Sequence, residues 1–83
     1  NEAGRAASIM AGLLWLAQRV HVPRFDLFEL GASAGVNTML DRYFFRLGET
    51  EVGPQTSPMR IVPEWCGASP PAPPPGFAIT SVK

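Results

Sequence analysis

The stretch FDLFELGASAG, Phe25 to Gly35, decides how this chain is expected to fold. Its first part, Phe25 to Leu30, is apolar apart from two acids, which is typical of a short strand inside a parallel sheet rather than at its edge. Gly31 ends that strand, and the loop up to Gly35 contains only Gly, Ala and Ser. A strand that runs into a tight small-residue turn is a common opening of α/β folds.

Helical spacing flanks this strand on both sides. Before it, the apolar residues from Ala6 to Val20 recur at i, i+3, i+4 and i+7, and Asn1 can cap the start. A following proline is expected to end this helix near His21. After the loop, apolar residues from Val36 to Leu47 repeat the spacing, and Gly48 stands where a glycine cap would end a helix.

The rest of the chain is expected to be less regular. The run Tyr43-Phe44-Phe45 also suits a strand, because aromatic residues favour sheets, although we favour the helix. Glu49 to Pro58 is expected to be a loop, since it contains turn-forming Gly and Pro. Met59 to Val62 is expected to be a short strand ended by a proline. Ser69 to Gly76, SPPAPPPG, predicts a stiff polyproline spacer.

The order helix, strand, tight turn, helix predicts an α/β fold, specifically the N-terminal fragment of a Rossmann-like three-layer sandwich. We expect a partial α/β unit over residues 1–68, a Pro-rich linker over 69–76 and the start of a following segment over 77–83. With 83 residues the chain is short for a stable domain, so we expect it to be a piece of a longer protein. A second copy could then cover an exposed sheet edge and give a homo-oligomer.

Composition disfavours several classes of partner. Seven basic and seven acidic residues give a net charge of zero, so the sequence has no excess of positive charge to attract nucleic acid or an anionic membrane. The longest apolar run, Ala6 to Ala17, is too short to span a bilayer. The single cysteine, Cys66, cannot form an internal disulfide or complete a cysteine metal site. We therefore expect a cytoplasmic protein without a metal.

The small-residue loop has the features of a cofactor site. Gly31, Ala32 and Gly35 let the backbone approach a nucleotide-like ligand closely. A helix that begins at Val36 would add free N–H groups and a positive dipole end. Ser33 stands where many dinucleotide loops have a glycine, which favours a methionine-derived ligand without a pyrophosphate over a dinucleotide.

Glu29 is the most informative side chain beside the loop. A carboxylate within an apolar strand costs several kcal/mol unless it is paired or faces a ligand. In a cofactor site Glu29 would hold the amino group of the methionine moiety, directly or through water. The alternative is a structural carboxylate that accepts N–H groups of the loop.

The loop also resembles known families. FELGASAGVN is similar to motif I of Rossmann-like methyltransferases, an acid followed by Gly-x-x-x-Gly. Together with NEAGR, DRY, P-x-R and EWCG, it resembles a family of uncharacterised bacterial proteins known only as a domain of unknown function, over Asn1 to about Gly67. The methyltransferase resemblance implies methyl transfer from S-adenosylmethionine to an unnamed acceptor. It also implies that the residues lining this cofactor are Glu29, Gly31, Ser33 and Gly35, with Asn37 close by.

Such methyltransferases next show an acid that binds the ribose hydroxyls. Glu64 is our candidate, because it follows the expected strand at Met59 to Val62, and Trp65 could stack on the adenine. Glu49 and Glu51 are nearer to the expected spacing but follow no predicted strand. The simpler interpretation of Glu64 and Trp65 is a surface acid beside a core aromatic.

Two other functions stay open. Gly31 to Gly35 also spells G-x-S-x-G, which would make Ser33 the nucleophile of a serine hydrolase. That chemistry needs a histidine base, and the single histidine, His21, precedes the serine instead of following it. The third hypothesis is a non-catalytic α/β module, whose loop is small only so that strand and helix pack closely.

Overall fold

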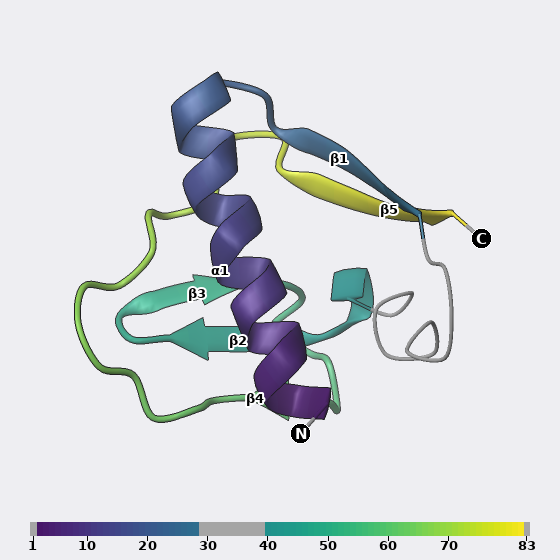
Figure 1. Cartoon of the computed structure of the whole chain (residues 1–83). Helices are drawn as coiled ribbons and strands as arrows, with labels where there is room; N and C mark the ends of the chain where they lie inside the picture. The colour runs from purple at the N-terminus through teal and green to yellow at the C-terminus, as the bar shows by residue number, and fades with distance from the viewer. Residues whose placement is uncertain (1, 29–39, 83) are drawn as a thin grey trace.

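The computed structural model describes residues 2–28 and 40–82 (Figure 1). Those residues form a small mixed α/β arrangement of one α-helix, one 3-10 turn and two small sheets, so the α/β class is confirmed at this level. No helix within them is long and apolar enough to cross a membrane. The elements, in chain order, are α1 (Glu2–Val20), β1 (Arg24–Phe28), η1 (Leu40–Arg42), β2 (Phe44–Leu47), β3 (Thr50–Val52), β4 (Arg60–Ile61) and β5 (Ala78–Val82).

Helix α1 confirms the helix predicted from the apolar spacing. Its buried face includes Ala6, Met10 and Leu14, which lie four residues apart and so share one side of the helix. The helix ends at Val20, and His21 follows with a φ of 57°. A residue in that left-handed conformation is a common way in which a helix is terminated.

The first sheet is the pair β1 and β5, which run parallel in a register from Arg24↔Ala78 to Phe28↔Val82. The backbone N–H of Ala78 also donates to the carbonyl of Pro23, at 2.9 Å. The predicted strand at Phe25 is therefore confirmed as a member of a parallel pair. Within the described residues this sheet has only two strands, so the predicted interior position of β1 is not found there. Because the strands are parallel, both carboxyl ends lie at one edge of this sheet.

The second sheet has the order β3-β2-β4, with β2 antiparallel to β3 and parallel to β4. The prediction of a helix reaching Leu47 is wrong here, because β2 occupies Phe44–Leu47. Part of the predicted 49–58 loop is likewise a strand, β3. Gly48, with a φ of 66°, lies in the turn between β2 and β3 instead of capping a helix.

Two adjacent aromatic residues explain why this segment is a strand. Phe44 and Phe45 are both fully buried, and neighbouring side chains on a strand point to opposite faces. Phe45 belongs to the core cluster, whereas the guanidinium carbon of Arg60 lies 4.1 Å from the centre of the Phe44 ring. A cation over an aromatic face is an attractive contact. Sheet pairing thus gives both rings a covered site.

An ion pair joins β2 and β3 on the surface. Arg46 and Glu51 are opposite each other in the register, and their charged groups lie 2.8 Å apart. The hydrogen bond from Arg46, followed by one from Gln55, lowers the pKa of the Glu51 carboxyl. Because both side chains are largely exposed, this pair contributes little to stability.

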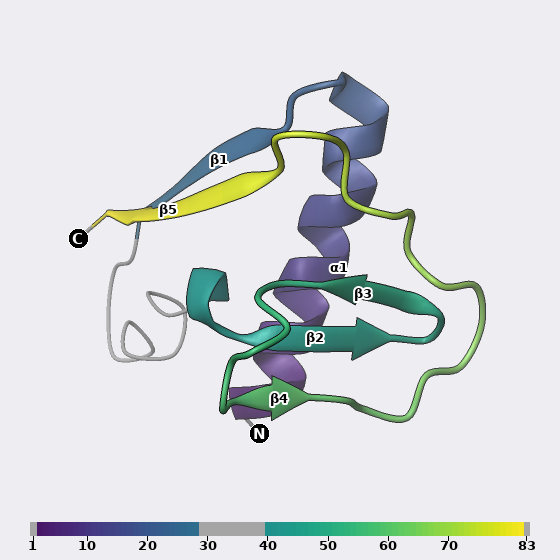
Figure 2. The ribbon, with the colours of Figure 1, turned by 180° about the vertical axis from the view of Figure 1, so that it is seen from behind.

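The segment 62–76 carries the chain from the second sheet back to β5 (Figure 2). It is attached to the β2–β3 hairpin, since the Ser69 hydroxyl accepts from the backbone N–H of Glu49 at 2.8 Å. The Thr50 hydroxyl also donates to the carbonyl of Pro70. Residues 69–76, for which a stiff polyproline spacer is predicted, contain no helix or strand, and their role as a linker stays a prediction.

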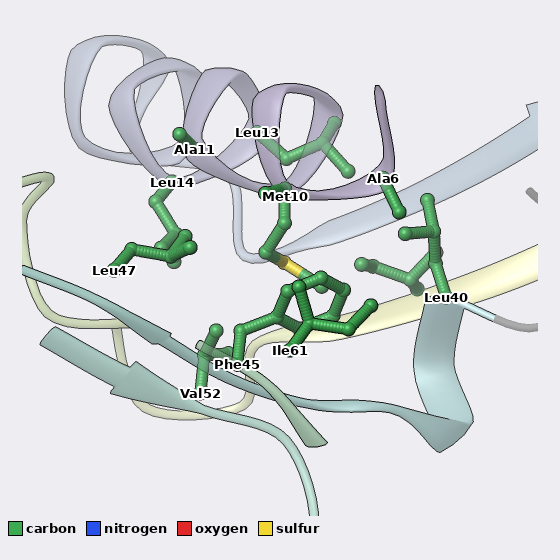
Figure 3. Close-up of a cluster of buried hydrophobic side chains, with 12 residues drawn as sticks. Ala6, Met10, Ala11, Leu13, Leu14, Leu40, Phe45, Leu47, Val52 and Ile61 are labelled. Atoms are coloured by element: carbon green, nitrogen blue, oxygen red, sulfur yellow. The ribbon is translucent and has the colours of Figure 1, made fainter. Parts of the chain in front are cut away.

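The hydrophobic core lies between α1 and the second sheet (Figure 3). Met10 and Leu14 of the helix point towards Phe45 and Leu47 of β2. Leu40 of η1 is fully buried in the same cluster, so the start of the chain segment that follows residue 39 is fixed against the core. Ile79 extends the cluster to β5, which joins the two sheets through one core.

Candidate functional site

The predicted cofactor loop follows the carboxyl end of β1. In the described structure β1 ends at Phe28, opposite Val82 of β5. The chain is described again from Leu40, in η1, which packs against β5. The described residues on both sides of the loop therefore border the same strand (Figure 1). The predicted site residues Glu29, Gly31, Ala32, Ser33, Gly35 and Asn37, and the predicted helix start at Val36, lie outside the described residues.

Glu64 lies in the irregular segment after β4, and its side chain is exposed. Figures 1 and 2 show this segment on the side of the molecule away from the carboxyl ends of β1 and β5. Trp65 is partly buried against the core cluster, and its indole N–H donates to the carbonyl of Ala68 at 2.9 Å. The structure thus does not bring Glu64 to the edge where the loop begins, and its ribose-binding role stays a prediction.

His21 lies at the other end of β1 from the loop. It follows α1 and comes three residues before the strand begins at Arg24, whereas the loop follows the end of the strand at Phe28. Its side chain is exposed. His21 is thus a surface residue at a helix end, at the opposite end of β1 from the start of the loop.

A cavity of about 500 Å³ lies between the two sheets, beside η1. Apolar side chains form most of its wall, and four of them belong to the core cluster: Met10, Leu40, Val52 and Ile79. The amino-terminal half of β5 and the end of the Pro-rich segment form another wall. Asp41 of η1 is the one charged side chain among the described lining residues.

Local sequence patterns do not reveal this cavity, because its walls come from four distant parts of the chain. Met10, Asp41, Val52 and Phe77 are separated by many residues and are joined only by tertiary packing. Asp41 appeared in the sequence only within the DRY segment that supported the family resemblance. No local spacing pattern links it to Phe77 or Met10.

The fold and the cavity define a small mixed α/β protein with a candidate small-molecule site. Within this class, the chain belongs to the family described as "Uncharacterized protein conserved in bacteria (DUF2332)", whose profile matches residues 1–83. The predicted resemblance to an uncharacterised bacterial family is therefore confirmed. Neither the curated proteins nor the solved structures contain a match to this chain.

Proposed function

We propose that this chain is part of a Rossmann-like enzyme that binds S-adenosylmethionine and transfers its methyl group to an acceptor. The observation that carries the proposal is the parallel pairing of β1 with β5. In open α/β sheets, ligands bind outside the carboxyl ends of parallel strands. The sequence Glu29 to Gly35 follows directly after that end of β1.

The residue chemistry of the loop supports the same function. Gly31, Ala32 and Gly35 offer little side-chain bulk, so a cofactor can approach the backbone. Ser33 and Asn37 add polar groups, and Glu29 would bind the amino group of the methionine moiety. S-adenosylmethionine, when bound, supplies an electrophilic methyl group. The chain's own contribution would be to hold donor and acceptor in line, which by itself removes much of an activation barrier.

The hydrolase and the non-catalytic module are weaker candidates. The described position of His21, at the far end of β1, adds nothing in favour of Ser33 as a nucleophile. The hypothesis of a non-catalytic module assigns no role to the edge at which the carboxyl ends of β1 and β5 lie together. A cytoplasmic location is part of the proposal, since a methyltransferase of this kind needs a supply of the cofactor.

Calorimetric titration with S-adenosylmethionine and S-adenosylhomocysteine tests the proposal. We expect dissociation constants on the order of micromolar for the wild-type protein. A Gly31→Val variant should bind at least about tenfold more weakly, because the added side chain fills the space that the cofactor needs. Gly12→Val is the matched control, since Gly12 is exposed on α1 and a Cβ there meets nothing within 4 Å.

The outcomes separate the three functions. Binding that Gly31→Val weakens and Gly12→Val leaves unchanged supports the methyltransferase. A folded wild-type protein that binds neither compound contradicts it. In that case, covalent labelling of the protein by a fluorophosphonate, lost in Ser33→Ala, would favour the hydrolase, and absence of labelling would favour the non-catalytic module.

A further inference from the structure

The cavity between the sheets has the size and the wall of a small-molecule site. Its volume of about 500 Å³ falls within the range typical of ligand pockets. The space is open to solvent, so a ligand could enter it directly from the surface. Met10, Leu40, Val52 and Ile79 are each less than a tenth exposed and form its apolar floor. Pro73, Pro74 and Phe77 are only partly buried and present more apolar surface to it. A ligand for this space therefore needs an apolar body.

One aromatic ring adds to the apolar wall. Phe77 lines the cavity and also packs on Phe25, with ring centres 6.2 Å apart and ring planes at 63°. This edge-to-face contact holds the Phe77 ring in place between β1 and the cavity. A ring held in this way suits an aryl group or an alkyl chain in the ligand.

The charge at the cavity is negative. Asp41 is the only charged side chain among the described residues that line it, and no arginine or lysine joins it there. The Asp41 side chain is exposed, so its carboxylate attracts a cation by the modest amount typical of an ion pair at a protein surface. It also repels a carboxylate or phosphate on a ligand. The negative charge of Asp41 therefore favours a positively charged ligand.

We propose that this cavity binds a small organic cation, an apolar or aryl body that carries one amine, with Asp41 as the counter-ion. The ammonium group would lie at η1, and the body would lie between Met10, Val52 and Phe77. This inference does not rest on the proposed function, because its residues differ from those of the loop.

Three probes with the same body and different charges test it: 4-phenylbutylamine, 4-phenylbutanol and 4-phenylbutyrate. Each is titrated at pH 7 into ¹⁵N-labelled protein, and the amide resonances of Gly53, Gly76 and Ala78, which line the cavity, are followed. The amine should move these resonances saturably and bind about fivefold more tightly than the alcohol, as for a partly exposed ion pair. The carboxylate should bind more weakly than either.

Two variants with the same change of charge give the decisive comparison. Asp41→Asn should remove the preference, so that the amine and the alcohol bind with equal affinity. Glu49→Gln also removes one exposed carboxylate, but away from the cavity, and should leave the preference unchanged. Equal affinities of the three probes for the wild-type protein would overturn the proposal. So would a preference that survives Asp41→Asn, or the lack of saturable amine binding up to about 10 mM.

Discussion

Two glycines show how much a single backbone position constrains this chain. Gly53 and Gly67 both have positive φ angles, of 101° and 89°. They differ in their surroundings, because a Cβ at Gly53 would lie 2.1 Å from the carbonyl oxygen of Tyr43, whereas one at Gly67 would meet nothing within 4 Å. A side chain at position 67 would therefore add conformational strain alone. A side chain at position 53 would add the same strain and also clash with the backbone at the open end of the β2–β3 hairpin.

Alanine at these two positions should have unequal effects. Gly67→Ala should lower the free energy of unfolding by about 1–2 kcal/mol, the cost of a left-handed residue with a side chain. Gly53→Ala should cost clearly more, about 3 kcal/mol or above, because backbone atoms of β2 and β3 must also move. Urea denaturation of both variants measures the difference. Equal losses would show that the close approach of Gly53 to Tyr43 does not matter.

A substitution at His21 should raise the free energy of unfolding instead of lowering it. Its φ of 57° places a residue with a Cβ in the position after α1 that glycine usually occupies. His21→Gly should therefore raise the free energy of unfolding by about 1 kcal/mol. His21→Ala, which removes the imidazole but keeps the strain, is the control and should bring no such gain. A lower thermal midpoint for His21→Gly than for the wild type would contradict this explanation.

At the scale of elements, local pattern predicted α1, β1 and β4. The apolar spacing from Ala6 to Val20 indicates a helix without reference to any other part of the chain. Phe25 likewise lies in a short apolar run, close to Pro23, that indicates a strand. The error at Phe44–Leu47 has a physical cause, because the apolar positions of that segment fit both a helix and a strand. The choice came from partners distant in sequence, Thr50–Val52 and Arg60–Ile61, which local spacing cannot reveal.

One buried hydroxyl connects the strands of this second sheet. The Ser57 Oγ donates to the carbonyl of Arg42 at 2.6 Å, just before β2, and accepts from the backbone N–H of Met59 at 3.2 Å, just before β4. Ser57 thereby bridges the starts of both strands. Its side chain is buried, so water does not readily replace it.

Ser57→Ala should cost about 1–3 kcal/mol, because it leaves part-buried backbone groups of Arg42 and Met59 without the hydroxyl as partner. Thr56→Ala, at the exposed neighbouring position, is the matched control and should change stability by no more than about 0.5 kcal/mol. Thermal unfolding followed by circular dichroism compares the two. A loss for Ser57→Ala no larger than that for Thr56→Ala would show that the hydroxyl does not hold β2 to β4.

At the scale of the whole molecule, the pairing of strands that are distant in the sequence could not be predicted from the sequence. β1 and β5 are at opposite ends of the chain, and nothing in Ala78–Val82 alone identifies Arg24–Phe28 as its partner. The cavity depends on the same pairing, because β5 forms one of its walls. The sequence did identify the strand that ends at the proposed cofactor loop, and the loop residues themselves stay predictions.

The measurement that tests the central claim most directly is a crystal structure of the protein with S-adenosylhomocysteine. We predict that the ligand lies beyond the carboxyl ends of β1 and β5, against residues 29–37, with its amino group at Glu29. A ligand bound elsewhere would contradict the account. So would a structure in which the Glu29 carboxylate is fully bonded to protein groups and no cleft adjoins the loop.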